Sequence, residues 1–214
     1  MKQAKKWLMS LALIFQVMGC QARLTPEQIV DAFFQAYRQQ DQHRVDELTH
    51  NSIDIGDFAS LDGLFENWED PWIEQEIQKF KEMFYGFEYT LQANEENGSS
   101  ARVKVDFLTY ALGEQLLPAV SQMLMSAFQR TFVGDIEQEK INQDTTRILL
   151  KHFNQSQKTY RKSFWIYLSL DEDGFWFIDM ENNDELADAL SGGSREAALK
   201  ISNDFANQIE NGLS

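Results

Sequence analysis

The chain has a single cysteine, Cys20, among its 214 residues. An internal disulfide is therefore excluded, and so are zinc sites that need two or more thiolates. The three histidines, His43, His50 and His152, include no pair spaced four residues apart. The sequence predicts no metal and no other cofactor. If the chain is exported, its folded domain must depend on a hydrophobic core rather than on disulfides.

Basic residues are scarce. Nineteen Lys and Arg face 34 Asp and Glu, which gives a net charge of −15. A surface of this sign repels nucleic acid and anionic lipid headgroups alike. After residue 19, Arg161 and Lys162 form the only adjacent basic pair. We therefore predict no nucleic-acid partner and no membrane binding driven by charge.

Long hydrophobic runs are also missing. The N-terminal apolar stretch covers only residues 7–18 and is interrupted by Ser10 and Gln16, whereas a membrane-spanning helix needs about 20 apolar residues. Three lysines, at positions 2, 5 and 6, precede this stretch and Gly19 follows it. A basic start, a short apolar run and a small residue are the three parts of a secretory signal peptide. The pattern predicts a signal peptide over residues 1–19 rather than a transmembrane anchor.

Val17-Met18-Gly19-Cys20 resembles the lipobox of bacterial lipoproteins. The resemblance implies that Cys20 carries a diacylglyceryl group, with acyl chains such as palmitate, and becomes the first mature residue. Residues 20–24 would be the lipidated cysteine and a short tether. The protein would lie on the outer, extracytoplasmic face of the cell membrane. Because cleavage removes three lysines, the net charge would fall from −15 to −18, and the lipid alone would hold the protein there.

Residues 25–190 are predicted to form one α+β domain. Thr25, Pro26 and Gln28 have the types and spacing that start a helix, and Asn97-Gly98 is typical of a tight hairpin turn. A second hairpin, over residues 160–180, is apolar on both faces and is predicted to be covered on both. Two helices, at about residues 112–156, interrupt the sheet, and a last helix occupies residues 191–214. We expect helices packed on a curved antiparallel sheet.

The segment Asp173-Gly174-Phe175-Trp176-Phe177-Ile178-Asp179 closes this predicted sheet. Together with the order of the elements it resembles the nuclear transport factor two-like, or cystatin-like, cone. The chain is especially similar to uncharacterised lipoproteins of Gram-positive bacteria that carry such a domain. The resemblance implies a concave sheet face and a family that contains both binding modules and enzymes.

Two groups of residues are candidates for binding. Met123, Met125 and Phe128 lie in the helical insertion, where flexible methionines can form an adaptable groove or fill the core. Periodicity predicts one amphipathic stripe on the first inserted helix, made of Leu116, Leu117, Val120, Leu124 and Phe128. We expect the two inserted helices to be antiparallel neighbours. Trp68 and Trp72, set among acids, offer aromatic surfaces for a cationic peptide or amine. Alternatively, those acids simply favour the start of a helix.

Two acids at strand positions, Asp106 and Asp179, are the candidates for general acid–base chemistry. A carboxylate buried in a concave pocket would have a raised pKa and could move protons. However, the sequence contains no nucleophile–base spacing and no phosphate-binding loop. We therefore expect a non-catalytic binding or accessory module for a peptide, a lipid or an envelope protein. A small isomerase or hydrolase using these acids is one alternative, and a structural spacer is another.

Overall fold

Four antiparallel strands form one sheet in the order β1-β2-β3-β4. The computed structural model describes residues 23–49, 71–133 and 137–212, so the predicted signal peptide, Cys20 and Trp68 lie outside the described residues. The strands are β1 (Glu88–Asn97), β2 (Ser100–Thr109), β3 (Tyr160–Leu170) and β4 (Trp176–Ile178). The helices are α2 (Pro26–Arg38), α3 (Gln42–Thr49), α6 (Pro71–Phe84), α7 (Leu112–Val133), α8 (Gln138–Phe153), the 3-10 helix η1 (Met180–Asn182), α9 (Asp184–Leu190) and α10 (Ser194–Gly212).

The predicted mixed α+β fold is confirmed: helices pack on a curved antiparallel sheet, and the helical pair α7–α8 interrupts it before the last hairpin. The sheet stays open rather than closing into a barrel. Asn97 pairs with Ser100 across the predicted turn, where Gly98 has a φ of +66°. The register of β1 against β2 shifts between Leu91 and Ala93, which marks an irregularity in β1.

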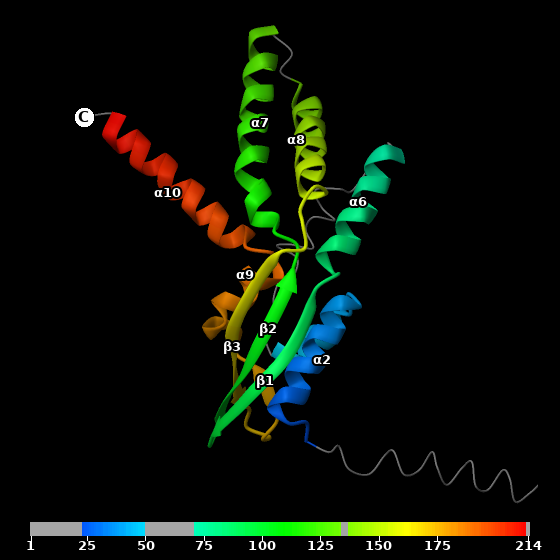
Figure 1. The fold of residues 1–214 in the computed structure, drawn as a ribbon, viewed down its shortest axis with the longest axis vertical. Helices are drawn as coiled ribbons and strands as arrows, with labels where there is room; N and C mark the ends of the chain where they lie inside the picture. The colour runs from blue at the N-terminus through cyan, green and yellow to red at the C-terminus, as the bar shows by residue number, and fades with distance from the viewer. Residues whose placement is uncertain (1–22, 50–70, 134–136, 213–214) are drawn as a thin grey trace, which may run out of the picture.

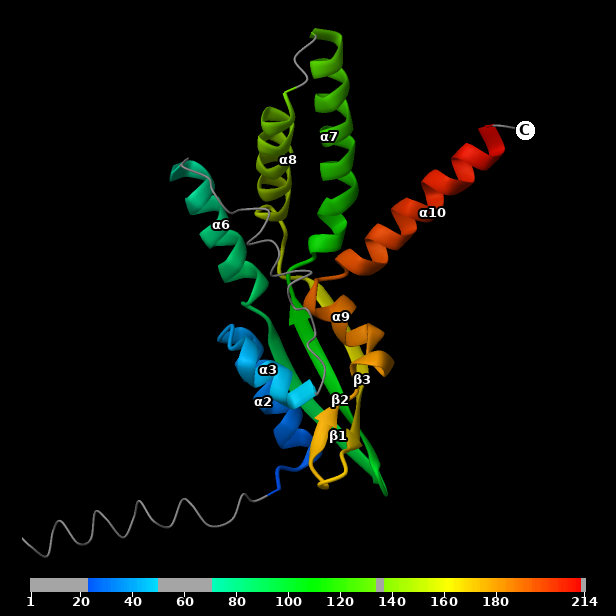
Figure 2. The ribbon, with the colours of Figure 1, turned by 180° about the vertical axis from the view of Figure 1, so that it is seen from behind.

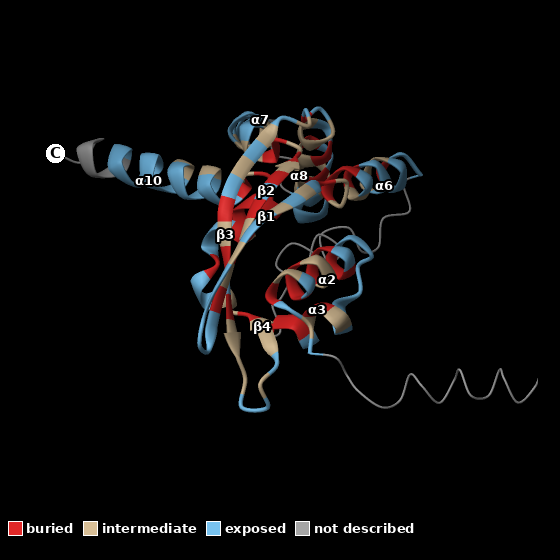
Figure 3. Ribbon diagram, turned by 60° about the horizontal axis from the view of Figure 1, so that its bottom comes forward, coloured by how far each residue is buried: buried red, intermediate tan, exposed pale blue. Residues whose placement is uncertain are grey.

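The core lies between the inner face of the sheet and α2. Val103, Val105 and Phe107 alternate along β2 and are all buried, as are Phe164, Ile166 and Leu168 on β3. Val30, Phe33 and Phe34 of α2 have no exposed surface, and Figure 3 shows α2 and α3 lying in the curve of the sheet. Each of these large side chains stabilises the fold by about 1.5–3 kcal/mol on burial.

The first described helix begins where the sequence predicts. The hydroxyl of Thr25 accepts a hydrogen bond from the backbone N–H of Gln28, and the Gln28 side chain accepts one from the Thr25 backbone. This reciprocal pair satisfies two N–H groups that have no partner within a helix. It fixes Thr25 as the residue at which α2 begins.

The outer face of β3 differs from the prediction that both of its faces are covered. Trp165 is half-buried and Tyr167 is exposed. The Arg102 guanidinium lies over the Trp165 ring, 4.3 Å from its centroid. The guanidinium stacked on Trp165, and the polar groups of the Trp and Tyr rings, lower the free-energy cost of exposing these two side chains to water. The prediction that this face of the hairpin is covered is therefore wrong.

The inserted helices α7 and α8 project from one end of the sheet along the long axis of the molecule (Figures 1 and 2). The described chain begins toward the opposite end (Figures 1 and 2), where Arg23 contacts the β3–β4 loop. Helix α10 leaves from the base of α7 and diverges from it. α6 packs beside α8, where the Phe80 and Phe153 rings stack with centroids 5.7 Å apart.

Candidate functional site

Helix α7 has one side turned toward α8. Arg130 forms an ion pair with Asp144 of α8 at 2.6 Å, and Ser126 donates a hydrogen bond to the same carboxylate. Nearer the sheet, Gln122 contacts the ring of His152 at 2.7 Å. Ala119 on this side is fully buried. These contacts fix which side of α7 packs and which side does not.

The other side of α7 is apolar and exposed. Its large side chains are exposed to the following extents: Leu117 55 %, Leu124 45 %, Met125 64 %, Phe128 66 % and Phe132 88 %. At about 100° per residue these five positions fall within one arc of about 100°. We call these five residues the α7 apolar face. The apolar stripe of a helix is normally buried against another element, so this exposed face is a candidate surface for a partner.

The size and charge of the α7 apolar face are unusual for this chain. With about 150–200 Å² for each fully exposed side chain, the five residues expose roughly 500–650 Å². The largest apolar patch on a monomeric protein is typically about 300–600 Å². No acid occurs in residues 115–133, and Arg130 is the only base there.

Across the described residues, no helix combines the length and apolarity needed to cross a membrane.

The predicted binding residues of α7 differ in how far they are exposed. Met125 and Phe128 lie on the α7 apolar face, whereas Met123 is half-buried. Of the predicted stripe, Leu117, Leu124 and Phe128 are exposed, whereas Leu116 and Val120 are half-buried. Periodicity alone did not show which side of α7 meets α8, because that side contacts α8 through Gln122, Ser126 and Arg130. Phe132 was not identified from the sequence.

Trp72 lies in the first turn of α6 and is exposed. Its proposed companion Trp68 lies outside the described residues, so the structure does not describe an aromatic pair here.

Asp106, the first candidate acid, is exposed and lies opposite Ser163 in the β2–β3 register. It lines an open depression of about 340 Å³ together with Glu88, Tyr89 and Arg161. Asp106 is therefore an exposed carboxylate in an open depression, rather than a group enclosed in a pocket.

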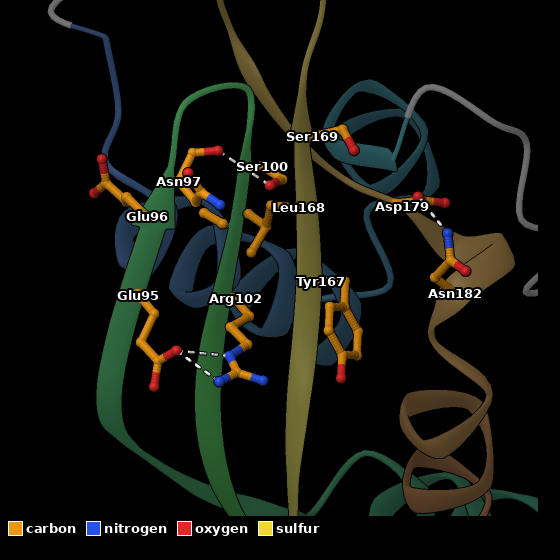
Figure 4. Close-up of a pocket in the computed structure, with 11 residues that line it drawn as sticks. Glu95, Glu96, Asn97, Ser100, Arg102, Tyr167, Leu168, Ser169, Asp179 and Asn182 are labelled. Atoms are coloured by element: carbon orange, nitrogen blue, oxygen red, sulfur yellow. Dashed lines mark hydrogen bonds and ion pairs between the residues drawn. The ribbon is translucent and has the colours of Figure 1, made fainter.

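Asp179, the second candidate acid, is half-buried at the edge of a pocket of about 740 Å³. Its carboxylate accepts a hydrogen bond from the Asn182 side chain at 2.7 Å. Figure 4 shows that this pair lies apart from the Glu95–Arg102 ion pair, which spans β1 and β2 in the same pocket. The pocket holds no histidine or lysine among its lining residues. Asp179 is thus held by the Asn182 side chain.

Sequence reasoning missed a buried amide beside this pocket. The Asn183 side chain accepts a hydrogen bond from the Tyr167 backbone N–H at 3.0 Å. It also donates one to the Tyr167 carbonyl at 2.9 Å and another to the Asp179 carbonyl. In this way one side chain replaces a strand residue at the edge of β3 and fixes the backbone of Asp179. Asparagine in a loop carries no sequence signal for such a role.

A second missed group is Asp188, a buried acid in α9. Its carboxylate accepts hydrogen bonds from the Tyr160 hydroxyl at 2.7 Å, the Lys162 ammonium at 3.2 Å and the Glu196 backbone N–H at 2.9 Å. Burial alone would raise the pKa of Asp188, but these three donors lower it below its ordinary value. Burial, and the hydrogen bond to Asp188, raise the pKa of Tyr160. The carboxylate joins β3, α9 and the first turn of α10.

We expect Asp188→Asn to lower the free energy of unfolding by about 2–3 kcal/mol at pH 7, because it weakens hydrogen bonds to a buried charge. A lowered folded pKa means that this stabilisation is present above the unfolded value of about 3.9 and is lost as the pH falls through the folded pKa. Urea unfolding of both proteins from pH 7 down to pH 3 should therefore show the difference shrinking. Asp204→Asn, at an exposed position of α10, is the matched control. An Asp188→Asn difference that does not change with pH would contradict this account.

Among the described residues there is no group of three or more His, Cys, Asp or Glu side chains placed to hold a metal ion. The candidate surfaces are therefore the α7 apolar face and the polar pocket at Asp179.

The sequence matches no family model and no curated protein. Among solved structures, the chain is similar to the crystal structure of a "putative lipoprotein" from Bacillus subtilis, with 12% sequence identity and a TM-score of 0.44. The similarity covers 77% of this chain and 59% of that one. The chain thus spans less than two thirds of the length of this structural neighbour.

Proposed function

We propose that the protein is a lipid-anchored extracytoplasmic protein that binds another protein through the α7 apolar face, without catalysis. One observation supports the binding role most directly: the side of α7 that faces away from α8 carries five large apolar side chains, all of them exposed. Exposed apolar area of this extent marks protein interaction sites.

The anchor is proposed from the lipobox-like Val17-Met18-Gly19-Cys20 segment. Arg23 follows Cys20 by three residues, a span of about 10 Å at most. The Arg23 guanidinium donates a hydrogen bond to the Asp173 carbonyl in the β3–β4 loop. A lipid on Cys20 would therefore hold this end of the domain at the bilayer, with α7 and α8 projecting from the opposite end (Figure 1). The α7 apolar face would then lie far from the membrane that holds the anchor.

This geometry favours binding over the two alternatives. A pocket enzyme using Asp106 or Asp179 would need an enclosed carboxylate with a donor or base nearby, and these acids are exposed or held by Asn182. A structural spacer would have no need for an exposed apolar helix, since such a surface risks aggregation. A nuclear transport factor two-like domain remains part of the proposal, as a scaffold whose insertion carries the binding surface.

Photo-crosslinking in membranes of the native host tests the binding role. We expect a photoreactive phenylalanine analogue at Phe128 of the full chain to form a covalent adduct with another protein in high yield. The same analogue at Gln92, which is exposed on β1, serves as the control and should give little adduct. The readout is a band of increased mass on a denaturing gel. Absence of any Phe128 adduct, in a protein that is present at normal levels, would contradict the proposed function.

A further inference from the structure

We propose that the protein bound at the α7 apolar face is a second copy of this chain, paired α7 to α7 in a parallel homodimer. The inference rests on the proposed function, both for the exposed face and for the lipid anchor. Four independent features of the described residues and the sequence lead to it: charge, helical spacing, area and the position of the anchored end.

Charge limits where two copies can meet. Each anchored copy, cleaved before Cys20, would carry a net charge of −18, because the −15 of the full chain includes three lysines of the signal peptide. Contact over most of the surface is therefore opposed by repulsion. Residues 115–133 contain no acid, and their one base, Arg130, is paired with Asp144 of α8. A cationic partner would be recognised by carboxylates, which the face lacks. The face therefore suits a neutral, apolar surface like itself.

The spacing of the side chains suits a helix–helix seam. Leu117, Ser121, Leu124 and Phe128 follow one another at intervals of four, three and four residues, which is the alternation of positions that face the partner in a coiled coil. Met125 and Phe132 widen the seam on one side. In a parallel pair each of these residues meets its own counterpart. Apolar side chains therefore meet apolar side chains along about three turns, with Ser121 opposite Ser121.

The area is sufficient for a specific contact. Two copies of the α7 apolar face would remove roughly 1,000–1,300 Å² of surface from water, which reaches the lower end of the range for stable protein interfaces. The real contact would also include the small side chain of Ser121 between the large ones. A contact of this size is stable chiefly when the partners are kept close together.

The anchored end determines the orientation. The first described residue, Arg23, and the free tip of α7 lie toward opposite ends of the long axis (Figures 1 and 2). Two copies anchored in one bilayer must both have their Arg23 ends at the membrane. A two-fold axis along the membrane normal then brings the α7 helices together side by side and parallel. Confinement to one surface raises the effective concentration and favours the pair.

Cysteine crosslinking of the full chain in membranes tests the inference. Because Cys20 is the only natural cysteine and its thiol is taken up by the lipid, one introduced cysteine reports one position. We expect Leu117→Cys and Leu124→Cys, tested separately, each to give a covalent dimer of twice the chain mass on mild oxidation, in more than half of the molecules. A matched control, Gln92→Cys on the exposed part of β1, should give less than one tenth of that yield.

The outcomes separate the two proposals. Crosslinking of Leu117→Cys with itself supports the parallel pair, because in an antiparallel pair residue 117 would lie near residue 132 of the other copy. Crosslinking only between co-expressed Leu117→Cys and Phe132→Cys chains would overturn the parallel arrangement. No dimer at either position, together with a photo-adduct of another mass at Phe128, would overturn the homodimer and leave the proposed function standing. Loss of every adduct would overturn both. A dimer formed by the unmodified chain through Cys20 would instead contradict the lipid anchor.

Discussion

Replacement of Cys20 by serine is expected to move the protein from the membrane fraction almost entirely into the soluble or unprocessed fraction. Serine lacks the thiol that accepts the diacylglyceryl group. Each methylene group that leaves the bilayer costs about 0.8 kcal/mol, and two acyl chains anchor stably where one is marginal. The remaining chain is strongly acidic and has no charge attraction to anionic lipid.

Cell fractionation and labelling with radioactive palmitate measure this effect. The wild type should carry label and sediment with membranes, whereas Cys20→Ser should do neither. Ser10→Ala, in the same N-terminal segment, is the matched control and should behave like the wild type. Mass spectrometry of the mature N-terminal peptide should give a diacylated Cys20. Correct cleavage of the serine variant with unchanged membrane partition would contradict the anchor.

The second large effect is expected at Gly192, where α7, α9 and α10 meet. Gly192 has a φ of +59°, and a Cβ atom there would lie 2.1 Å from the carbonyl oxygen of Tyr110. The Gly192 carbonyl also accepts a hydrogen bond from the Gly113 backbone N–H at 3.0 Å in the first turn of α7. Because the clash is with backbone, a side-chain rotation cannot relieve it. We expect Gly192→Ala to lower the free energy of unfolding by about 3–5 kcal/mol, from left-handed strain and overpacking together.

Gly98→Ala separates the two causes. Gly98 has a similar φ of +66°, but nothing lies within 4 Å of a Cβ atom placed there. This variant should lose only the strain, about 1–2 kcal/mol. Since 1 kcal/mol shifts the melting temperature by about 2–4 °C in a domain of this size, calorimetry distinguishes them. Equal melting temperatures for Gly98→Ala and Gly192→Ala would show that the close approach at Tyr110 does not constrain the fold.

Local features of the fold were predictable because neighbouring residues determine them. The start of α2 follows from Thr25, Pro26 and Gln28, whose hydrogen bonds span only three residues. The β1–β2 turn follows from Asn97-Gly98, since glycine adopts a positive φ without a steric penalty. The lipobox resemblance at Cys20 is likewise a matter of a few adjacent residues, and it stays a prediction until the thiol is analysed.

The tertiary structure alone decided the features that depend on contacts between distant residues. The sequence marked α7 as apolar, but only the packing of α8 decided that Leu117, Leu124 and Phe128 would be exposed. Asn183 and Asp188 gained their roles from residues 16 to 28 positions away, and neither residue type signals such a role. Sequence by itself therefore determined the local starts, turns and charge of this protein. Which apolar side is buried depends on the assembled fold, because a side chain is buried only when another element covers it.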